Sequence, residues 1–135
     1  MKERTLLWLL YCFVAAPVAA QPPKVALELN KSEDIAGKCR IYFVTREQSG
    51  TRLDTQKTEI IVFQKDGAIG RKVLVELGPV RANKTSVKVF DLDLPCSELA
   101  SVLINDVSEC GPNQKTEECL EGLTPSSRIS IMLTR

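Results

Sequence analysis

The sequence predicts an exported all-β protein: an immunoglobulin-like sandwich of two sheets, with about seven strands and two disulfides. Three observations predict this class. An apolar N-terminal segment ends in small residues, an even number of cysteines follows it, and apolar residues alternate with polar ones through most of the remaining chain. Alternation with a period of two is typical of strands that bury one face. Short strands separated by frequent turns, in a chain of this length, are typical of a sandwich.

The N-terminal segment has the three parts of a secretory signal peptide. Lys2 and Arg4 supply positive charge, residues 6–16 form an uninterrupted apolar run, and Val18-Ala19-Ala20 provides small residues before Gln21. A membrane-spanning helix needs about 20 apolar residues, so the run is too short for an anchor. The two basic residues are not adjacent, which favours the general secretory route over the twin-arginine route.

The expected cleavage divides the chain into a signal peptide, residues 1–20, and one sandwich domain, residues 21–135. The chain has 18 basic and 17 acidic groups, and removing Lys2, Glu3 and Arg4 leaves 16 of each. A domain without net charge has no long-range field that attracts nucleic acid or anionic lipid. We therefore expect a periplasmic or secreted domain with no nucleic-acid binding and no stable membrane insertion after cleavage.

Seven strands are expected after a mobile lead-in over residues 21–24. In order, they cover residues 25–29, 39–45, 55–64, 69–77, 85–92, 102–107 and 128–134. The first two and the last alternate cleanly, and their inward residues are Val25, Leu27, Leu29, Cys39, Ile41, Phe43, Ile129, Ile131 and Leu133. Asp66-Gly67 separates the third strand from the fourth, because glycine accepts the positive φ of a tight turn at little cost.

The fifth expected strand has apolar residues on both faces. It follows the break at Gly78-Pro79 and carries Val87 and Val89 on its expected inner face, whereas Phe90 and Leu92 have the opposite parity. A strand changes its buried face where it contains an extra residue or a bend. We therefore expect a bulge near Phe90.

Residues 97–107 leave two alternatives open. In the first, one helical turn over residues 97–100 precedes a strand that contains Val102-Leu103-Ile104. In the second, Ser97 caps a continuous short helix that reaches Asn105. The strand is preferred, because the apolar run is compact and lies between residues that break secondary structure.

Four cysteines remain after cleavage, since Cys12 leaves with the signal peptide, and four cysteines allow three pairings. If strand directions alternate, Cys39 and Cys96 lie at one end of the sandwich and Cys110 and Cys119 at the other. A strand of seven or eight residues is roughly 25 Å long. A disulfide needs Cα atoms within about 7 Å. The predicted bonds are therefore Cys39–Cys96 and Cys110–Cys119.

The residue types favour a protein without catalysis, cofactor or metal. The chain has no histidine, which removes the usual general base, the common nucleophile systems and the commonest metal ligand. Asp91 and Asp93 are the best-spaced pair of carboxylates for glycoside hydrolysis. Calcium needs six or more oxygen ligands, and the neighbours of these two residues do not supply them. A solvated strand end is the favoured interpretation of the pair.

The segment between Cys110 and Cys119 is the expected binding surface. Its polar tip, Asn113, Gln114 and Lys115, is held at the base by the predicted bond. Such a loop loses little conformational entropy when it binds a partner. The alternative is a loop that is tied down only for stability.

The arrangement resembles a group of small, uncharacterised exported bacterial proteins, often labelled as twin-arginine signal domain proteins. The residues that carry the resemblance are Cys39-Arg40, Phe43-Val44, Phe63, Asp66-Gly67, Leu77-Gly78-Pro79, Lys84-Thr85, Phe90-Asp91-Leu92, Pro95-Cys96, residues 102–107, Cys110, Cys119 and Ser127-Arg128. The resemblance covers nearly all of the expected mature chain. It implies a periplasmic location in a bacterium, and it implies no activity, catalytic residue or ligand.

Together these features favour a non-catalytic, exported binding or accessory module whose partner is another periplasmic or envelope protein. The alternative is a small secreted inhibitor of a hydrolase of lysozyme type, acting through the Cys110–Cys119 loop. The size, the export signal and the two disulfides suit both functions.

Cleavage after Ala20 is the first testable expectation. The intact mass of the protein recovered after export should correspond to residues 21–135, because the signal features end at Val18-Ala19-Ala20. Retention of residues 1–20, or a lipid adduct on Cys12, would contradict it.

Overall fold

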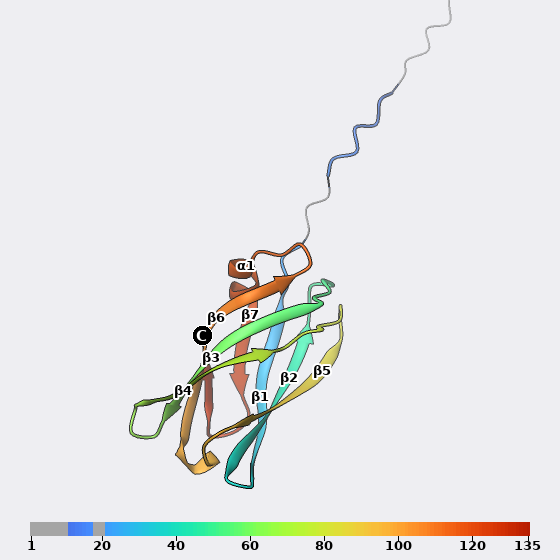
Figure 1. Ribbon diagram of the computed structural model, residues 1–135. Coiled ribbons are helices and arrows are strands. Elements are labelled where there is room, and N and C mark those ends of the chain that lie inside the picture. Colours follow the sequence, from blue (N-terminus) through green and yellow to red (C-terminus); the bar gives the residue numbers. More distant parts are fainter. Residues whose placement is uncertain (1–10, 18–20) are drawn as a thin grey trace, which may run out of the picture.

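The computed structural model describes residues 11–17 and 21–135. The expected signal peptide lies largely outside these residues, and so does the expected cleavage site after Ala20. Residues 11–17 have no regular secondary structure, and the side chain of Phe13 is 94% exposed. Figure 1 shows this segment leading away from the rest of the chain. Within the described residues, no helix has the length and hydropathy needed to cross a membrane.

Two four-stranded sheets form a sandwich, as the sequence predicts (Figure 1). One sheet has the order β5 (Thr85–Leu92), β2 (Lys38–Glu47), β1 (Val25–Ile35) and β7 (Leu123–Ser127). The other has the order β4 (Ile69–Glu76), β3 (Thr55–Gln64), β6 (Leu99–Gly111) and β8 (Met132–Thr134). Neighbouring strands are antiparallel, except that β7 runs parallel to β1 and β8 runs parallel to β6. A 3₁₀ turn, η1 (Cys96–Glu98), precedes β6, and a short helix, α1 (Thr116–Glu121), precedes β7.

The core lies between the inner faces of the two sheets. The alternation predicted for β1 and β2 is confirmed, since Val25, Leu27, Leu29, Cys39, Ile41 and Phe43 are all at most 2% exposed. The second sheet contributes Ile60, Val62, Val75, Val102 and Ile104. Each fully buried aliphatic side chain contributes about 1.5–3 kcal/mol relative to an exposed one, so this double layer is the main source of stability.

The sandwich has eight strands and not the predicted seven, and the additional strand is β7. Its sequence, Leu-Thr-Pro-Ser-Ser, has few of the residues that favour strands and contains Pro125. Proline cannot donate a ladder hydrogen bond and is tolerated on edge strands, and β7 is the edge strand beside β1. The last expected strand, residues 128–134, is accordingly shorter, although Ile131 and Leu133 are buried as expected.

Two predictions were made for the fifth strand, an inner face with Val87 and Val89 and a bulge near Phe90, and both were wrong. Val87 and Val89 point outward and are 57% and 45% exposed, whereas Leu92 is buried and Phe90 packs against the core. No bulge occurs, since the pairing of β5 with β2 has no register shift. The ladder sets Leu92 beside the buried Cys39, so the register with β2 decides which parity of β5 faces inward.

The preferred interpretation of residues 97–107, a helical turn followed by a strand, is confirmed, and the alternative of a continuous helix to Asn105 is wrong. Only η1 is helical there, and β6 begins at Leu99 and extends to Gly111, well beyond the expected strand. The register of β6 with β3 shifts at three points, so this long strand bends as it crosses the sheet.

Both predicted disulfides are confirmed, at opposite ends of the sandwich. Cys39 in β2 is bonded to Cys96 in η1, and Cys110 in β6 is bonded to Cys119 in α1. Strand directions alternate along the chain as the prediction assumed, but the last strand runs opposite to its expected direction, because the additional strand β7 precedes it and leaves β8 parallel to β6. The pairing holds nevertheless, since Cys119 precedes β7 and stays at the end where β6 finishes.

The two bonds should differ in their effect on stability. Replacing Cys39 and Cys96 by serine is expected to lower the free energy of unfolding by about 4 kcal/mol, and replacing Cys110 and Cys119 by about 3 kcal/mol. The reason is loop length, since the sequence separations are 57 and 9 residues. Urea unfolding at pH 7 measures both values. A larger loss from the shorter loop would show that local contacts of α1, rather than chain entropy, dominate.

Candidate functional site

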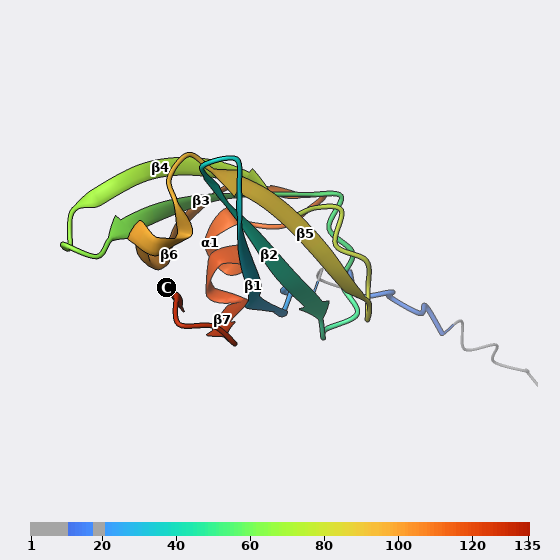
Figure 2. The same ribbon diagram turned by 90° about the horizontal axis from the view of Figure 1, so that it is seen from below.

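The clearest candidate site is the end of the sandwich that carries α1. Three segments far apart in the sequence meet there: the lead-in of residues 21–24, the loop of residues 48–54 between β2 and β3, and the loop and helix after β6 (Figures 1 and 2). Cys119 is 1% exposed, and its bond to Cys110 fixes α1 to the end of β6. The disulfide therefore holds a helix of only six residues, which would not be stable by itself.

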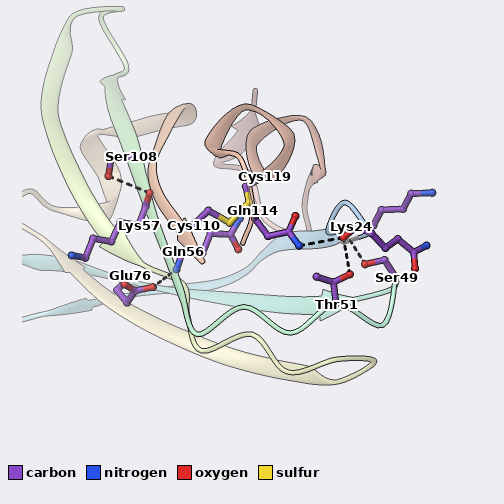
Figure 3. The surroundings of a disulfide bond; sticks show 11 residues. Lys24, Ser49, Thr51, Gln56, Lys57, Glu76, Ser108, Cys110, Gln114 and Cys119 are labelled. Atoms are coloured by element: carbon purple, nitrogen blue, oxygen red, sulfur yellow. Dashed lines mark hydrogen bonds between the residues drawn. A yellow bond between two sulfur atoms is a disulfide. The ribbon is translucent and has the colours of Figure 1, made fainter. Parts of the chain in front are cut away.

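The lead-in is held in place by hydrogen bonds from both neighbouring loops. The backbone oxygen of Gln21 accepts from Gln114 Nε2 at 3.3 Å and from Thr51 Oγ1 at 3.1 Å. The backbone nitrogen of Lys24 donates to Ser49 Oγ at 3.2 Å. Figure 3 shows these side chains directed at the lead-in beside the Cys110–Cys119 bond. The lead-in was expected to be mobile. These contacts were not predicted, because the residues that hold it lie 25 to 93 positions away from it in the sequence.

Gly122 allows the lead-in to pass directly over the end of α1. A Cβ atom at this position would lie 2.1 Å from the backbone oxygen of Pro23, far closer than two such atoms can approach. The backbone oxygen of Gly122 also accepts from the nitrogen of Val25 at 2.9 Å. Any larger residue here would push the lead-in away from α1.

These segments enclose an open groove of about 410 Å³. It is lined by Pro22, Pro23, Lys24, Gln48, Glu118, Glu121, Gly122 and Thr124. Two prolines and a glycine give it apolar surface, while two carboxylates from α1 and one ammonium group give it charge of both signs.

Glu47 positions the loop that forms one wall of the groove. Its side chain is buried, and its carboxylate accepts hydrogen bonds from the backbone nitrogens of Ser49 (2.8 Å), Gly50 (2.9 Å) and Asn83 (2.9 Å), and from the hydroxyl of Ser49. Burial alone would raise the pKa of Glu47, but the donors of Asn83 and Ser49 outweigh it and hold the pKa at about 2. One carboxylate thus joins the β2–β3 loop to the loop before β5.

The structural role of Glu47 was not predicted from the sequence. Its signal was available, since Glu47 has the same parity in β2 as Cys39, Ile41 and Phe43, and this parity faces inward. A charged residue on the buried parity of a strand indicates a carboxylate with several donors.

The structure divides the three predicted binding residues into two groups. Asn113 and Lys115 are exposed at the tip, where Asn113 adopts a positive φ of 61°. Gln114 is partly buried and uses its side chain to hold Gln21. The loop is also shorter than expected, because α1 begins at Thr116. Two of the three residues are therefore available to a partner, and the third positions the lead-in.

Asp91 and Asp93 both form ion pairs with basic side chains. Asp91 accepts from Arg40 at 2.7 and 3.0 Å, and Asp93 lies 3.2 Å from Lys38 and 3.3 Å from Arg71. The hydrogen bonds from the Arg40 guanidinium hold the pKa of Asp91 below its ordinary value. A glycoside hydrolase needs one carboxylic acid that keeps its proton, and Asp91 does not meet this requirement. Within residues 11–17 and 21–135, no three potential metal-ligating side chains of the types His, Cys, Asp and Glu come together.

Comparison with known proteins finds no matching family model, no matching curated protein and no matching solved structure. The function proposed below therefore rests on the residues of this chain.

Replacing Glu47 by glutamine should destabilise the domain in a pH-dependent way. The pKa of Glu47 is about 2 in the folded chain, below its ordinary value of 4.5, so the unfolded chain binds the proton more tightly. The contribution of the carboxylate is therefore fully present above about pH 5 and is lost as the pH falls through 4.5 towards 2. The difference in unfolding free energy between parent and variant should be about 3 kcal/mol at pH 7 and should shrink towards pH 2.

Urea unfolding at several pH values measures this difference. Asp54→Asn is the control, because the ion pair of Asp54 with Arg52 is largely exposed and should contribute less than about 1 kcal/mol. A difference for Glu47→Gln that stays constant from pH 7 to pH 2 would show that the carboxylate charge is not what holds the two loops.

Proposed function

We propose that this chain is a non-catalytic binding module, exported to the periplasm or secreted, which binds another envelope protein at its α1 end. The observation that carries the proposal is the groove of about 410 Å³ whose walls come from three distant segments. A disulfide, the hydrogen bonds to Gln21 and Lys24, and the Glu47 carboxylate hold these walls in position. Walls that are already ordered lose little conformational entropy on binding.

The groove lining suggests the chemistry of the occupant. Glu118 and Glu121 place two negative charges on the α1 wall, and Lys24 places one positive charge on the other. An extended segment that carries a basic residue beside small apolar residues would pair with the carboxylates of α1 and cover Pro22 and Pro23. The proposed partner is therefore a protein with such a segment, and not a small anion.

The proposed location rests on the N-terminal sequence and on the two disulfides. The charged start, the short apolar run and the small residues before Gln21 are those of a secretory signal. Disulfides persist in oxidising compartments such as the periplasm and the extracellular space.

Inhibition of a hydrolase of lysozyme type is the second candidate function. It is favoured by the tip of the disulfide-bonded loop, where Pro112, Asn113 and Lys115 are all exposed. A rigid, protruding loop can enter the cleft of an enzyme without first becoming ordered. This function would use the tip, whereas the leading proposal uses the groove behind it.

Glu118→Ala/Glu121→Ala should weaken partner capture at least tenfold, or about 1.4 kcal/mol. Both residues line the groove, and alanine is a good helix former, so the unfolding free energy should change by less than about 1 kcal/mol. Affinity capture from periplasmic extract, with quantitative mass spectrometry, compares the variant with the parent. Glu117→Ala is the matched control, because Glu117 is an exposed carboxylate of the same helix that does not line the groove.

The tip is tested separately with Asn113→Gly/Lys115→Ala, in which glycine accepts the positive φ at position 113. Loss of capture with this variant alone, together with a captured hydrolase whose activity falls on binding, would favour the inhibitor. Unchanged capture with the groove variant would overturn the proposed use of the groove.

A further inference from the structure

A second pocket, of about 440 Å³, lies along β5 at the margin of the sandwich (Figure 1). It is lined by residues 85–88 of β5 and by Pro79, Arg81 and Lys84 of the loop before this strand. Successive side chains of a strand point to opposite faces, so a pocket that touches four residues in a row lies beside the backbone. Because β2 occupies one edge of β5, the pocket borders the backbone N–H and C=O groups of the other, free edge.

The free edge of β5 is the one best suited to accept another strand. Among the strands that the structure describes, β5, β7, β4 and β8 lie at the margins of the two sheets. β7 contains Pro125, β8 has only three residues, and the pairing of β4 with β3 contains a register shift. Such features protect an edge from pairing with another chain. By contrast, β5 has eight residues, no proline and a continuous register with β2.

The pocket carries positive charge that no carboxylate in its lining balances. Its three basic side chains are Arg81, Lys84 and Lys88. Among residues 11–17 and 21–135, none of the three forms an ion pair. Arg71 and Lys72 of the other long edge strand, β4, are both paired with carboxylates. The β5 edge therefore differs from the β4 edge in its charge.

The Lys88 side chain is held across the opening between the two sheets. Lys88 is paired with the buried Phe43, so it has the parity of β5 that faces inward. Its Nζ donates to the backbone oxygen of Gly78 at 3.2 Å, in the loop that follows β4. An ammonium group has three donors, so this contact positions Lys88 beside the edge and leaves donors for a ligand.

The loop before β5 is fixed at several points. Val80 and Leu53 exchange two backbone hydrogen bonds, of 2.7 and 2.9 Å. The backbone nitrogen of Asn83 donates to the Glu47 carboxylate at 2.9 Å, and the backbone oxygen of Lys84 accepts from the nitrogen of Glu47 at 3.1 Å. Glu47 does not line the pocket, and its carboxylate is directed at backbone donors. The basic side chains therefore extend from an ordered backbone, which reduces the entropy lost on binding.

We propose that the free edge of β5 binds an extended acidic segment of another protein, which adds to the sheet as a further strand. Backbone hydrogen bonds to β5 supply affinity, and Arg81, Lys84 and Lys88 select acidic side chains. The same basic residues disfavour pairing with β5 of a second copy, because like charges would then lie on adjacent strands. This site shares no lining residue with the groove at α1, so it is a second binding surface.

The parity of β5 defines the sequence that the segment should have. Lys84 and Lys88 share one parity, whereas Val87 and Val89 project from the other face and are 57% and 45% exposed. Residues that are opposite each other in paired strands lie on the same face. The segment should therefore carry acidic residues four positions apart, with β-branched apolar residues at positions of the other parity.

The peptide Val-Glu-Val-Thr-Val-Glu-Val has this pattern in both chain directions and is the probe. Added up to about 1 mM to the isotope-labelled protein recovered after export, it should shift the NMR amide resonances of residues 84–89. The peptide Val-Lys-Val-Thr-Val-Lys-Val should leave these resonances unshifted. Val-Glu-Pro-Pro-Val-Glu-Val keeps the charge but lacks one N–H on each edge, so it should also fail to bind.

Lys84→Gln/Lys88→Gln should raise the dissociation constant of the acidic peptide at least tenfold. Lys84→Gln alone leaves the Lys88–Gly78 contact intact and should raise it about threefold, as expected for one exposed ion pair. Lys65→Gln is the matched control, because Lys65 is an exposed lysine without an ion pair in the turn between β3 and β4. It should bind as the parent does, and the amide spectra should show the same fold for all variants.

Four results would overturn the proposal. The first is a parent whose β5 resonances do not shift at the highest peptide concentration. The second is equal binding of the proline peptide, which would show attraction between charges without strand addition. The third is a loss with Lys65→Gln as large as that with the double variant. The last is a shift of the β5 resonances with protein concentration alone, which would show that a second copy occupies the edge.

Discussion

The unbroken inner face of β2 is the constraint on which the rest of this structure depends. Five alternate residues, Cys39, Ile41, Phe43, Thr45 and Glu47, are all at most 3% exposed. Cys39 anchors η1 through a disulfide, and Ile41 and Phe43 fill the centre of the core. Glu47 accepts hydrogen bonds from three backbone N–H groups in two loops. Because β2 pairs with β1 on one side and β5 on the other, its register also determines which face of each neighbour is buried.

The α1 end shows how a small domain can order a candidate binding surface without a larger core. A helix of six residues, a proline-containing lead-in and a loop have little stability separately. Here the Cys110–Cys119 bond, the Gln21 carbonyl and the Glu47 carboxylate each join segments from different parts of the chain. Side chains such as Gln114 hold the site together, while neighbours such as Glu121 line the groove.

Alternation determined the class of fold and the inner faces of β1 and β2, because period-two burial is a local property. Alternating strand directions, together with the short reach of a disulfide, determined both disulfides. Only the tertiary structure decided which face of β5 is buried, since both parities are apolar and the register with β2 selects one. It also decided that residues 123–127 form a strand, because β1 supplies the ladder that their own sequence does not favour. The candidate site was predicted only in part. Asn113 and Lys115 are exposed at the tip of the Cys110–Cys119 loop but do not line the groove. The groove depends on Gln21, Gly122 and Glu47, whose roles arise from partners that are distant in the sequence and adjacent only after folding.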